Sequence, residues 1–195
     1  SERENYRLQI LYWRYTVRKT IIVALTVILL SFGSLAFGLN DTDNHPVTMI
    51  INEIAMMALN SPGGITLTTN QPLLAGGDVA GDTNSTKELR YTSLVAVGIT
   101  RKITASLSGD LPPAGTSLDL EASDVVGGTG VTGSAVVGGI TLGVGAQNII
   151  TGIGSCATGT ANGAVLTYTF NIDTVGDLVV GANSNSVVNF TLTDN

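Results

Sequence analysis

Residues 87–97 read KELRYTSLVAV, a stretch in which every second residue belongs to one largely apolar set. A period of two is typical of a β-strand that buries one face, because successive side chains of a strand point to opposite sides. The side chains expected on the buried face are Leu89, Tyr91, Ser93, Val95 and Val97. This stretch predicts a half-buried strand.

The same alternation recurs along the rest of the chain. Residues 100–108 (TRKITASLS) place Ile103, Ala105 and Leu107 on one face, with Arg101, Thr104 and Ser106 near or on the other. Period-two runs also cover 116–122, 163–172 and 187–193, shorter runs cover 64–69 and 138–144, and turn-forming clusters of Gly, Pro, Asn and Asp lie between them. Strands with one apolar face bury it against a second sheet, so we predict an all-β domain, a two-sheet β-sandwich of immunoglobulin-like or jelly-roll type.

Residues 49–60 (MIINEIAMMALN) fit this pattern less well. Ile51, Ile54, Ala55, Ala58 and Leu59 have helical spacing, and Met and Ala favour helices. We predict a strand because everything after it is β, with a helix as the alternative. Only two polar residues interrupt the apolar run, so we expect it to be buried on nearly all sides.

The N-terminal residues have the layout of an export signal. Arg18 and Lys19 precede an apolar run over 21–30, and small residues end at Gly38. We predict a basic flank and a signal peptide over 1–38, cleaved after Gly38, a linker over 39–46 and the β-sandwich domain over 47–195. The alternative is an uncleaved anchor helix over 20–38, about 28 Å long, through which alone the protein would contact a membrane. Either reading predicts a secreted or cell-surface protein.

Charge separates the two parts of the chain. Residues 1–38 carry five basic and two acidic residues, and residues 39–195 carry four basic and thirteen acidic ones. A strongly acidic domain repels phosphate backbones, so we expect no nucleic-acid partner.

Catalytic motifs are missing from the sequence. Gly128, Gly130 and Gly133 have the spacing of a dinucleotide fingerprint, but the residues that follow do not form a helical pattern, so we predict a hairpin or bulge region there. The only histidine is His45, in the linker, and the only cysteine is Cys156. A Ser or Cys nucleophile with a histidine base and a zinc site are therefore not expected, nor is an internal disulfide. Cys156 is predicted to be a quiet thiol, with an intermolecular bridge as the alternative.

Acidic residues leave two weaker hypotheses open. Asp119, Glu121 and Asp124 lie close in sequence, as paired carboxylates of a glycoside hydrolase would, but outward acids on a solvated strand explain them more simply. Asp78, Asp82 and Asn84 offer oxygen ligands of the kind that calcium prefers, although their spacing does not match a known calcium loop. We predict no enzyme and no cofactor, with calcium as the single candidate ion.

Several stretches, 100–120, 146–156, 163–172 and 187–195, resemble blocks of uncharacterised, secreted bacterial β-sandwich proteins. More loosely, a signal segment followed by an acidic, Gly- and Thr-rich sandwich is similar to subunits of extracellular fibres and biofilm matrices. The looser resemblance implies a secreted structural or adhesive protein. The apolar segment Val47–Leu59 lies beside a polar linker, so it could complete the sheet of a neighbouring copy by β-strand addition. In the simpler interpretation, that segment is the first strand of its own domain.

The alternative function is a module that binds extracellular glycan or calcium. The aromatic residues of the domain lie on predicted core faces, which weakens the glycan hypothesis.

Overall fold

The computed structural model describes Trp13, Arg14, Thr16 and residues 44–195. The predicted signal or anchor segment and the first half of the linker lie outside these described residues, apart from the three helical positions near the N-terminus. The chain divides into two units, residues 1–49 and 50–195. In the described ranges no helix is long and apolar enough to cross a bilayer.

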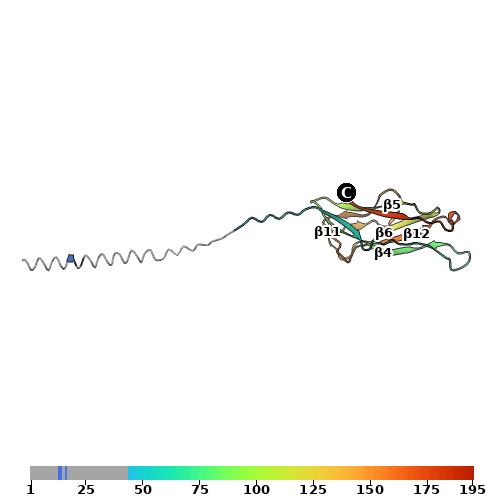
Figure 1. Cartoon of the computed structure of the whole chain (residues 1–195), viewed down its shortest axis with the longest axis horizontal. Coiled ribbons are helices and arrows are strands. Elements are labelled where there is room, and N and C mark those ends of the chain that lie inside the picture. The colour runs from blue at the N-terminus through green and yellow to red at the C-terminus, as the bar shows by residue number, and fades with distance from the viewer. Residues whose placement is uncertain (1–12, 15, 17–43) are drawn as a thin grey trace, which may run out of the picture. The chain divides into compact units, whose positions relative to one another are not determined.

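The second unit is built from β-strands, and all of its strand pairs are antiparallel. The larger sheet contains seven strands, which are β1 (Ile54–Leu59), β4 (Thr83–Leu94), β6 (Thr116–Ala122), β7 (Thr129–Gly130), β9 (Ile140–Thr141), β11 (Cys156–Ala157) and β12 (Ala164–Ile172). Its order is β7-β11-β4-β12-β6-β9, and β1 pairs with β4. Figure 1 shows β4, β12 and β6 close together.

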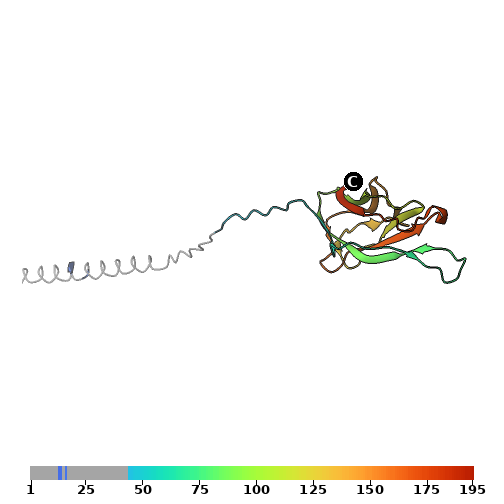
Figure 2. The same cartoon turned by 45° about the vertical axis from the view of Figure 1, so that its right-hand side comes forward.

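A second sheet contains four strands in the order β13 (Ser186–Asp194), β5 (Arg101–Gly109), β10 (Gln147–Ile153) and β8 (Ser134–Ala135). The C-terminal strand β13, drawn in red, runs beside β5 in both views of the cartoon (Figure 2). A short hairpin of β2 (Thr69–Asn70) and β3 (Ala80–Gly81) and a 3-10 turn, η1 (Val175–Asp177), complete the secondary structure of the described residues.

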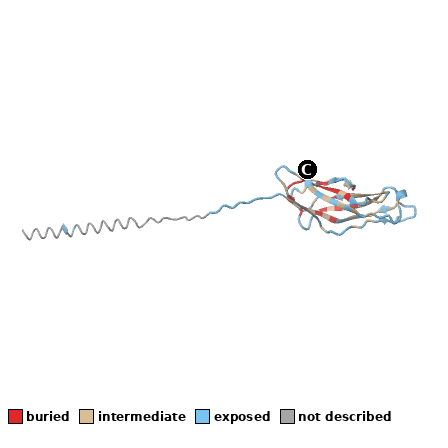
Figure 3. Ribbon diagram, turned by 45° about the horizontal axis from the view of Figure 1, so that its top comes forward, coloured by how far each residue is buried: buried red, intermediate tan, exposed pale blue. Residues whose placement is uncertain are grey.

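One hydrophobic core joins the two larger sheets. Leu89, Leu120 and Leu166 come from the seven-stranded sheet, Ile103 and Ile150 come from the four-stranded sheet, and all five are almost completely buried. The buried residues lie along the strands, and the exposed ones lie outside and in the loops (Figure 3). The unit is therefore all-β with multiple sheets that share a core, consistent with a β-sandwich.

Most of the predicted strands are confirmed, with their expected faces. In β5, β6 and β13 the apolar side chains expected on the inner face are buried or pack against the core. In β12 this holds for Ala164, Leu166 and Tyr168, whereas Phe170 and Ile172 are only half-buried. The strand predicted over 87–97 is confirmed as far as Leu94, where β4 ends. Val95 is only half-buried and Val97 is fully exposed, so their predicted burial was wrong. The chain turns away from the sheet at this point, which removes both residues from the core face.

Strand β10 escaped prediction because its alternation is broken. Ile149 and Ile150 are adjacent in sequence and both are buried. The pairing of β10 with β5 shifts register twice, between Asn148 and Ile150 and between Ile150 and Ile153. Bulges of this kind turn consecutive side chains to the same face, so a period of two cannot be recognised in the sequence.

The glycine-rich stretch 127–133 contains one short strand, β7, in otherwise irregular backbone, and no helix follows it as a phosphate loop would require. Gly130 lies in β7 with a φ of 77°, and a Cβ at this position would lie 2.1 Å from the carbonyl oxygen of Ser155. Gly133 has a φ of 80°, and a Cβ there would lie 2.5 Å from the carbonyl oxygen of Thr151. Only glycine combines this backbone conformation with so close an approach of a second chain segment.

Candidate functional site

The free edges of the sheets are the most distinctive surface of the described residues. Three of them, β7, β8 and β9, contain two residues each and offer little backbone for pairing. The fourth, β13, contains nine residues, but three of the four side chains on its outer face are Asn or Thr and its last residue is Asp194. The fifth, β1, contains six residues, IAMMAL, and none of them is charged.

Strand β1 is the first strand of its own domain. It pairs with β4 in an unbroken antiparallel register from Ile54 opposite Leu94 to Leu59 opposite Leu89. The strand prediction for this segment is confirmed, and the helical alternative is wrong because neighbouring backbone, which the local sequence does not report, supplies a template along β4.

The inner edge of β1 can be assigned from one backbone hydrogen bond. The N–H of Asn60, the residue after β1, donates to the carbonyl oxygen of Glu88 over 2.9 Å. Backbone groups of an antiparallel pair alternate between the two edges of a strand. Ile54, Met56 and Ala58 therefore direct their N–H and C=O groups toward β4.

It follows that Ala55, Met57 and Leu59 direct their N–H and C=O groups to the outer edge of β1. Among the described strands only β4 pairs with β1, so no strand is hydrogen-bonded to these outer groups. Natural edge strands are commonly protected by a charged residue, a proline or a bulge. Strand β1 has none of the three.

Burial along β1 is limited to two half-buried residues, Ile54 and Met57. Met57 lies opposite the buried Tyr91 and packs against the core. Met56, on the other face, is 66 % exposed, and Ala58 is also exposed. The expectation that this segment is buried on nearly all sides was wrong, because four of the six residues of β1 are exposed and only one edge of the strand is paired.

Apolar exposure continues before the strand. Residues 44–53 have no regular secondary structure and are all exposed, and their large apolar side chains are those of Val47, Met49, Ile50 and Ile51. Isolated exposed apolar residues are ordinary, whereas a contiguous group of them indicates an interaction surface. The apolar segment predicted from the sequence thus has a paired half, β1, and an unpaired half.

A single buried arginine, Arg101, ties the beginning of β1 to the domain through hydrogen bonds. Arg101, the first residue of β5, is 5 % exposed and donates to the Ile54 carbonyl oxygen and to the Glu53 carboxylate. Its Nε donates to Asp194 Oδ1 over 3.0 Å, and Nη1 approaches Ser93 Oγ at 3.3 Å. Both carboxylates are 62 % exposed, so the guanidinium reaches from the core to the solvent edge.

The sequence-based placement of Arg101 near the polar face was wrong. Arg101 and Ile103 are two positions apart on one strand and so share a face, and Ile103 is fully buried. The even spacing between Arg101 and Ile103 was the sequence signal that could have placed Arg101 on the buried face. Charge alone argued against burial, but three strands deliver acceptors to this arginine, and a buried charge is tolerated when it is paired and hydrogen-bonded.

A lysine holds the other end of β1. Lys87 in β4 is 8 % exposed, and its Nζ donates to the carbonyl oxygens of Ser61, over 3.2 Å, and of Gly63. Asn60 adds a side-chain bond from Nδ2 to the carbonyl oxygen of Thr86, over 3.1 Å. Both ends of β1 are therefore fastened to the domain, and the outer edge between them stays open.

The three calcium candidates do not converge on a shared position. Asp82 accepts hydrogen bonds from Thr68 N, Thr68 Oγ1 and Asn70 Nδ2, and the Thr68 hydroxyl together with these bonds holds the pKa of its carboxyl below the usual range. Asn84 Oδ1 accepts from Thr86, and Asp78 is exposed in the loop between β2 and β3. No cluster of acidic, His and Cys side chains suited to a metal occurs among the described residues.

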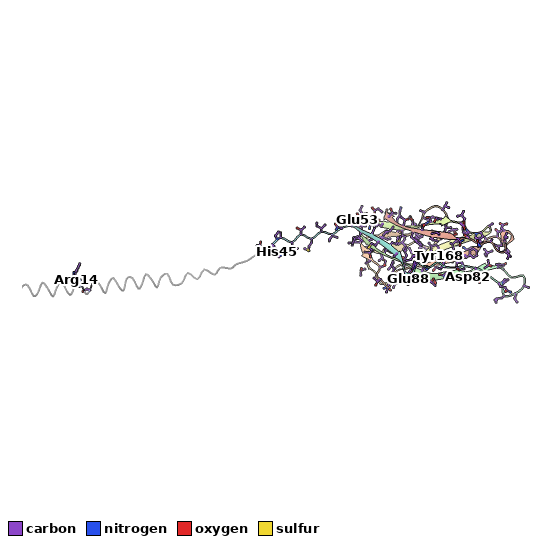
Figure 4. The ribbon with its side chains drawn as sticks, in the orientation of Figure 1. Arg14, His45, Glu53, Asp82, Glu88 and Tyr168 are labelled. Atoms are coloured by element: carbon purple, nitrogen blue, oxygen red, sulfur yellow. The ribbon has the colours of Figure 1, made fainter. Side chains whose placement is uncertain are left out.

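The candidate carboxylates are likewise occupied by structural bonds. Asp119 accepts from Thr141 Oγ1 and Asn171 Nδ2, and Asp124 accepts from the N–H of Ala135, which ties it to β8. Glu121 is exposed. Figure 4 shows Glu53, just before β1, and Asp82, just after β3, well apart along the domain, so these two acidic residues do not meet.

The single cysteine and Tyr91 are both buried. Cys156 lies in β11 against Ser93 of β4, and burial raises the pKa of its thiol. His45 is exposed in the described part of the linker. The Tyr91 hydroxyl donates to the Thr132 carbonyl oxygen over 2.6 Å, and burial raises its pKa far above the usual value. A buried, protonated thiol is a poor nucleophile, in keeping with the prediction of a quiet thiol.

Comparisons with protein-family models, with curated proteins and with solved structures found no match to this chain.

Proposed function

We propose that this chain is a secreted or surface-exposed structural or adhesive protein that self-associates by β-strand addition. The observation that carries the proposal is the outer edge of β1, which presents unpaired backbone groups on an uncharged, bulge-free strand. An extended backbone of another molecule supplies the matching donors and acceptors. A two-sheet sandwich of immunoglobulin-like or jelly-roll type is the architecture that we propose for the domain.

The surrounding residues favour an assembly role for this edge. Arg101 and Lys87 fasten the two ends of β1 to the domain, so the strand is held in place as a rigid template. The exposed apolar residues before β1 add surface that association would remove from water, a gain of about 25 cal/mol per Å² of apolar area. The export signal predicted from residues 18–38 would place this surface outside the cell.

Light scattering against concentration tests the proposal. A fragment of residues 39–195 contains the whole compact unit and its core, and lacks the apolar run of the N-terminus. We expect its mass to rise above that of a single copy as the concentration increases. Met56→Lys places a charge beside the free edge, on an exposed side chain, and should keep the fragment monomeric.

Val187→Lys is the matched control, since Val187 is 54 % exposed on the outer face of the other long edge strand, β13. This variant should associate as the parent does. A parent fragment that stays monomeric at millimolar concentration would contradict the proposal.

The second candidate function is an extracellular glycan- or calcium-binding module. Three bonds to Asp82 already use both carboxylate oxygens, which counts against calcium at this position. Thermal unfolding with calcium and with chelator tests the ion: a rise in Tm with calcium that disappears in Asp82→Asn would favour this candidate. Glycan-array binding of the fragment tests the sugar hypothesis.

A further inference from the structure

Strand β1 has a backbone pattern that is complementary to itself. Its outward N–H and C=O groups belong to Ala55, Met57 and Leu59, which are evenly spaced about Met57. When a second β1 approaches antiparallel, outward residues must face outward residues. A register centred on Met57 pairs Met57 with Met57 and Ala55 with Leu59, and so satisfies all six outward groups of each strand.

We propose that the occupant of this edge is the β1 edge of a second copy of the chain, related by a two-fold axis through Met57. The inference rests on the proposed function and names the partner and the register of its contact. A two-fold contact of this kind uses the same patch on both molecules and closes after two copies. The seven-stranded sheets of the two copies then form one continuous sheet.

The flanking residues agree with this register. It places Glu53 opposite Ser61 of the second copy, so the two Glu53 carboxylates do not face each other across the axis. Residues 54–61 contain no ionisable side chain, and pairing therefore brings no buried charge into the contact. The outer faces also match, since the half-buried Ile54 and the exposed Met56 and Ala58 of both copies join into one apolar ridge.

A shift by one pair gives a less suitable contact. A register centred on Met56 also brings outward groups together, but it sets Glu53 opposite Leu59 and leaves the carboxylate beside an apolar partner.

The net charge of −9 carried by residues 39–195 repels a second copy at long range. Association should therefore increase with ionic strength, because salt screens this repulsion.

Disulfide trapping distinguishes the registers. In the Met57-centred register Met56 of one copy lies opposite Ala58 of the other in a non-hydrogen-bonded pair, with Cα atoms about 4.5 Å apart, within the range of a disulfide. Met56 of one copy and Met56 of the other are diagonal neighbours about 7–8 Å apart, which is beyond the Cα–Cα range of a disulfide. Both side chains are on the exposed face, so Met56→Cys and Ala58→Cys leave the core unchanged.

The experiment uses the full chain in mild detergent, because of the apolar run over residues 21–30. Met56→Cys and Ala58→Cys chains are oxidised separately and as an equimolar mixture, and dimers are quantified on non-reducing gels. The mixture should give about tenfold more cross-linked dimer than either chain alone, because only the mixed pair has disulfide geometry. The unmodified chain is the control for Cys156, which is buried.

Two results would overturn the inference. Strong cross-linking by Met56→Cys alone indicates the Met56-centred register, and absence of cross-linking in the mixture indicates that β1 edges do not meet. Light scattering separates this failure from that of the proposed function. A chain that associates without the mixed cross-link retains a structural role through another surface, whereas a monomeric chain removes both.

Discussion

The guanidinium of Arg101 is buried and donates from Nε to Oδ1 of Asp194 over 3.0 Å, which joins the first residue of β5 to the last residue of β13. The same guanidinium bonds to Glu53 and to the carbonyl oxygen of Ile54. One side chain thus ties the beginning of β1, in the seven-stranded sheet, to two strands of the four-stranded sheet.

Arg101→Lys should lower the free energy of unfolding by about 2 kcal/mol, because an ammonium lacks the planar array of donors that serves several acceptors at once. Asp194→Asn should cost less than about 1 kcal/mol, since the Asp194 side chain is 62 % exposed and an exposed ion pair contributes little. Urea unfolding of the 39–195 fragment measures both. Equal stability of Arg101→Lys and the parent would show that the Arg101 hydrogen bonds do not hold the sheets together.

Met57→Ala should destabilise the domain by about 1–2 kcal/mol, because Met57 packs against the core opposite Tyr91. Met56→Ala is the matched control: this side chain is mostly exposed, and its removal should change the free energy of unfolding by less than about 0.5 kcal/mol. Thermal or urea unfolding compares them. The reverse order of stabilities would contradict the orientation of β1.

Gly130→Ala should be strongly destabilising, by about 3 kcal/mol or more, because its Cβ would lie 2.1 Å from a carbonyl oxygen in a backbone with positive φ. Gly138 has a φ of 81° and nothing within 4 Å of an added Cβ. Gly138→Ala should therefore cost only the conformational strain, about 1–2 kcal/mol. The difference between the two variants, measured by urea unfolding, isolates the close approach of β7 to the segment before β11.

Tyr168 should make the domain sensitive to alkali. Burial raises its pKa to about 12, whereas an unfolded tyrosine ionises near the model value of 10.0. The folded state therefore holds its proton more tightly. The stability contribution is complete below pH 10 and is lost as pH rises from 10 toward 12, by about 2 kcal/mol in all.

Tyr168→Phe removes the titrating group, so its free energy of unfolding should fall less between pH 10 and 12 than that of the parent. The buried Tyr91 also has a raised pKa and stays in both proteins, which leaves a residual slope in the variant. Identical pH profiles of parent and variant would contradict the assignment.

Alternation of side chains determined much of this fold. The strands β4, β5, β6, β12 and β13 follow from a period of two, and most of the apolar residues predicted on their core faces are buried or pack against the core. The rejection of a phosphate loop at residues 127–133 also followed from local sequence, since no helical pattern comes after the glycines. The predicted all-β class is confirmed on this basis.

Tertiary structure decided the features on which the functional proposals depend. The sequence of 49–60 is compatible with helix or strand, and the free length of β4 selects the strand for residues 54–59. Arg101 looks like a surface charge until Glu53, Ile54 and Asp194, which are distant in sequence, bring acceptors to it. Which strand is left at an edge depends on how the sheet is ordered, and this order arises from long-range packing that no local period encodes.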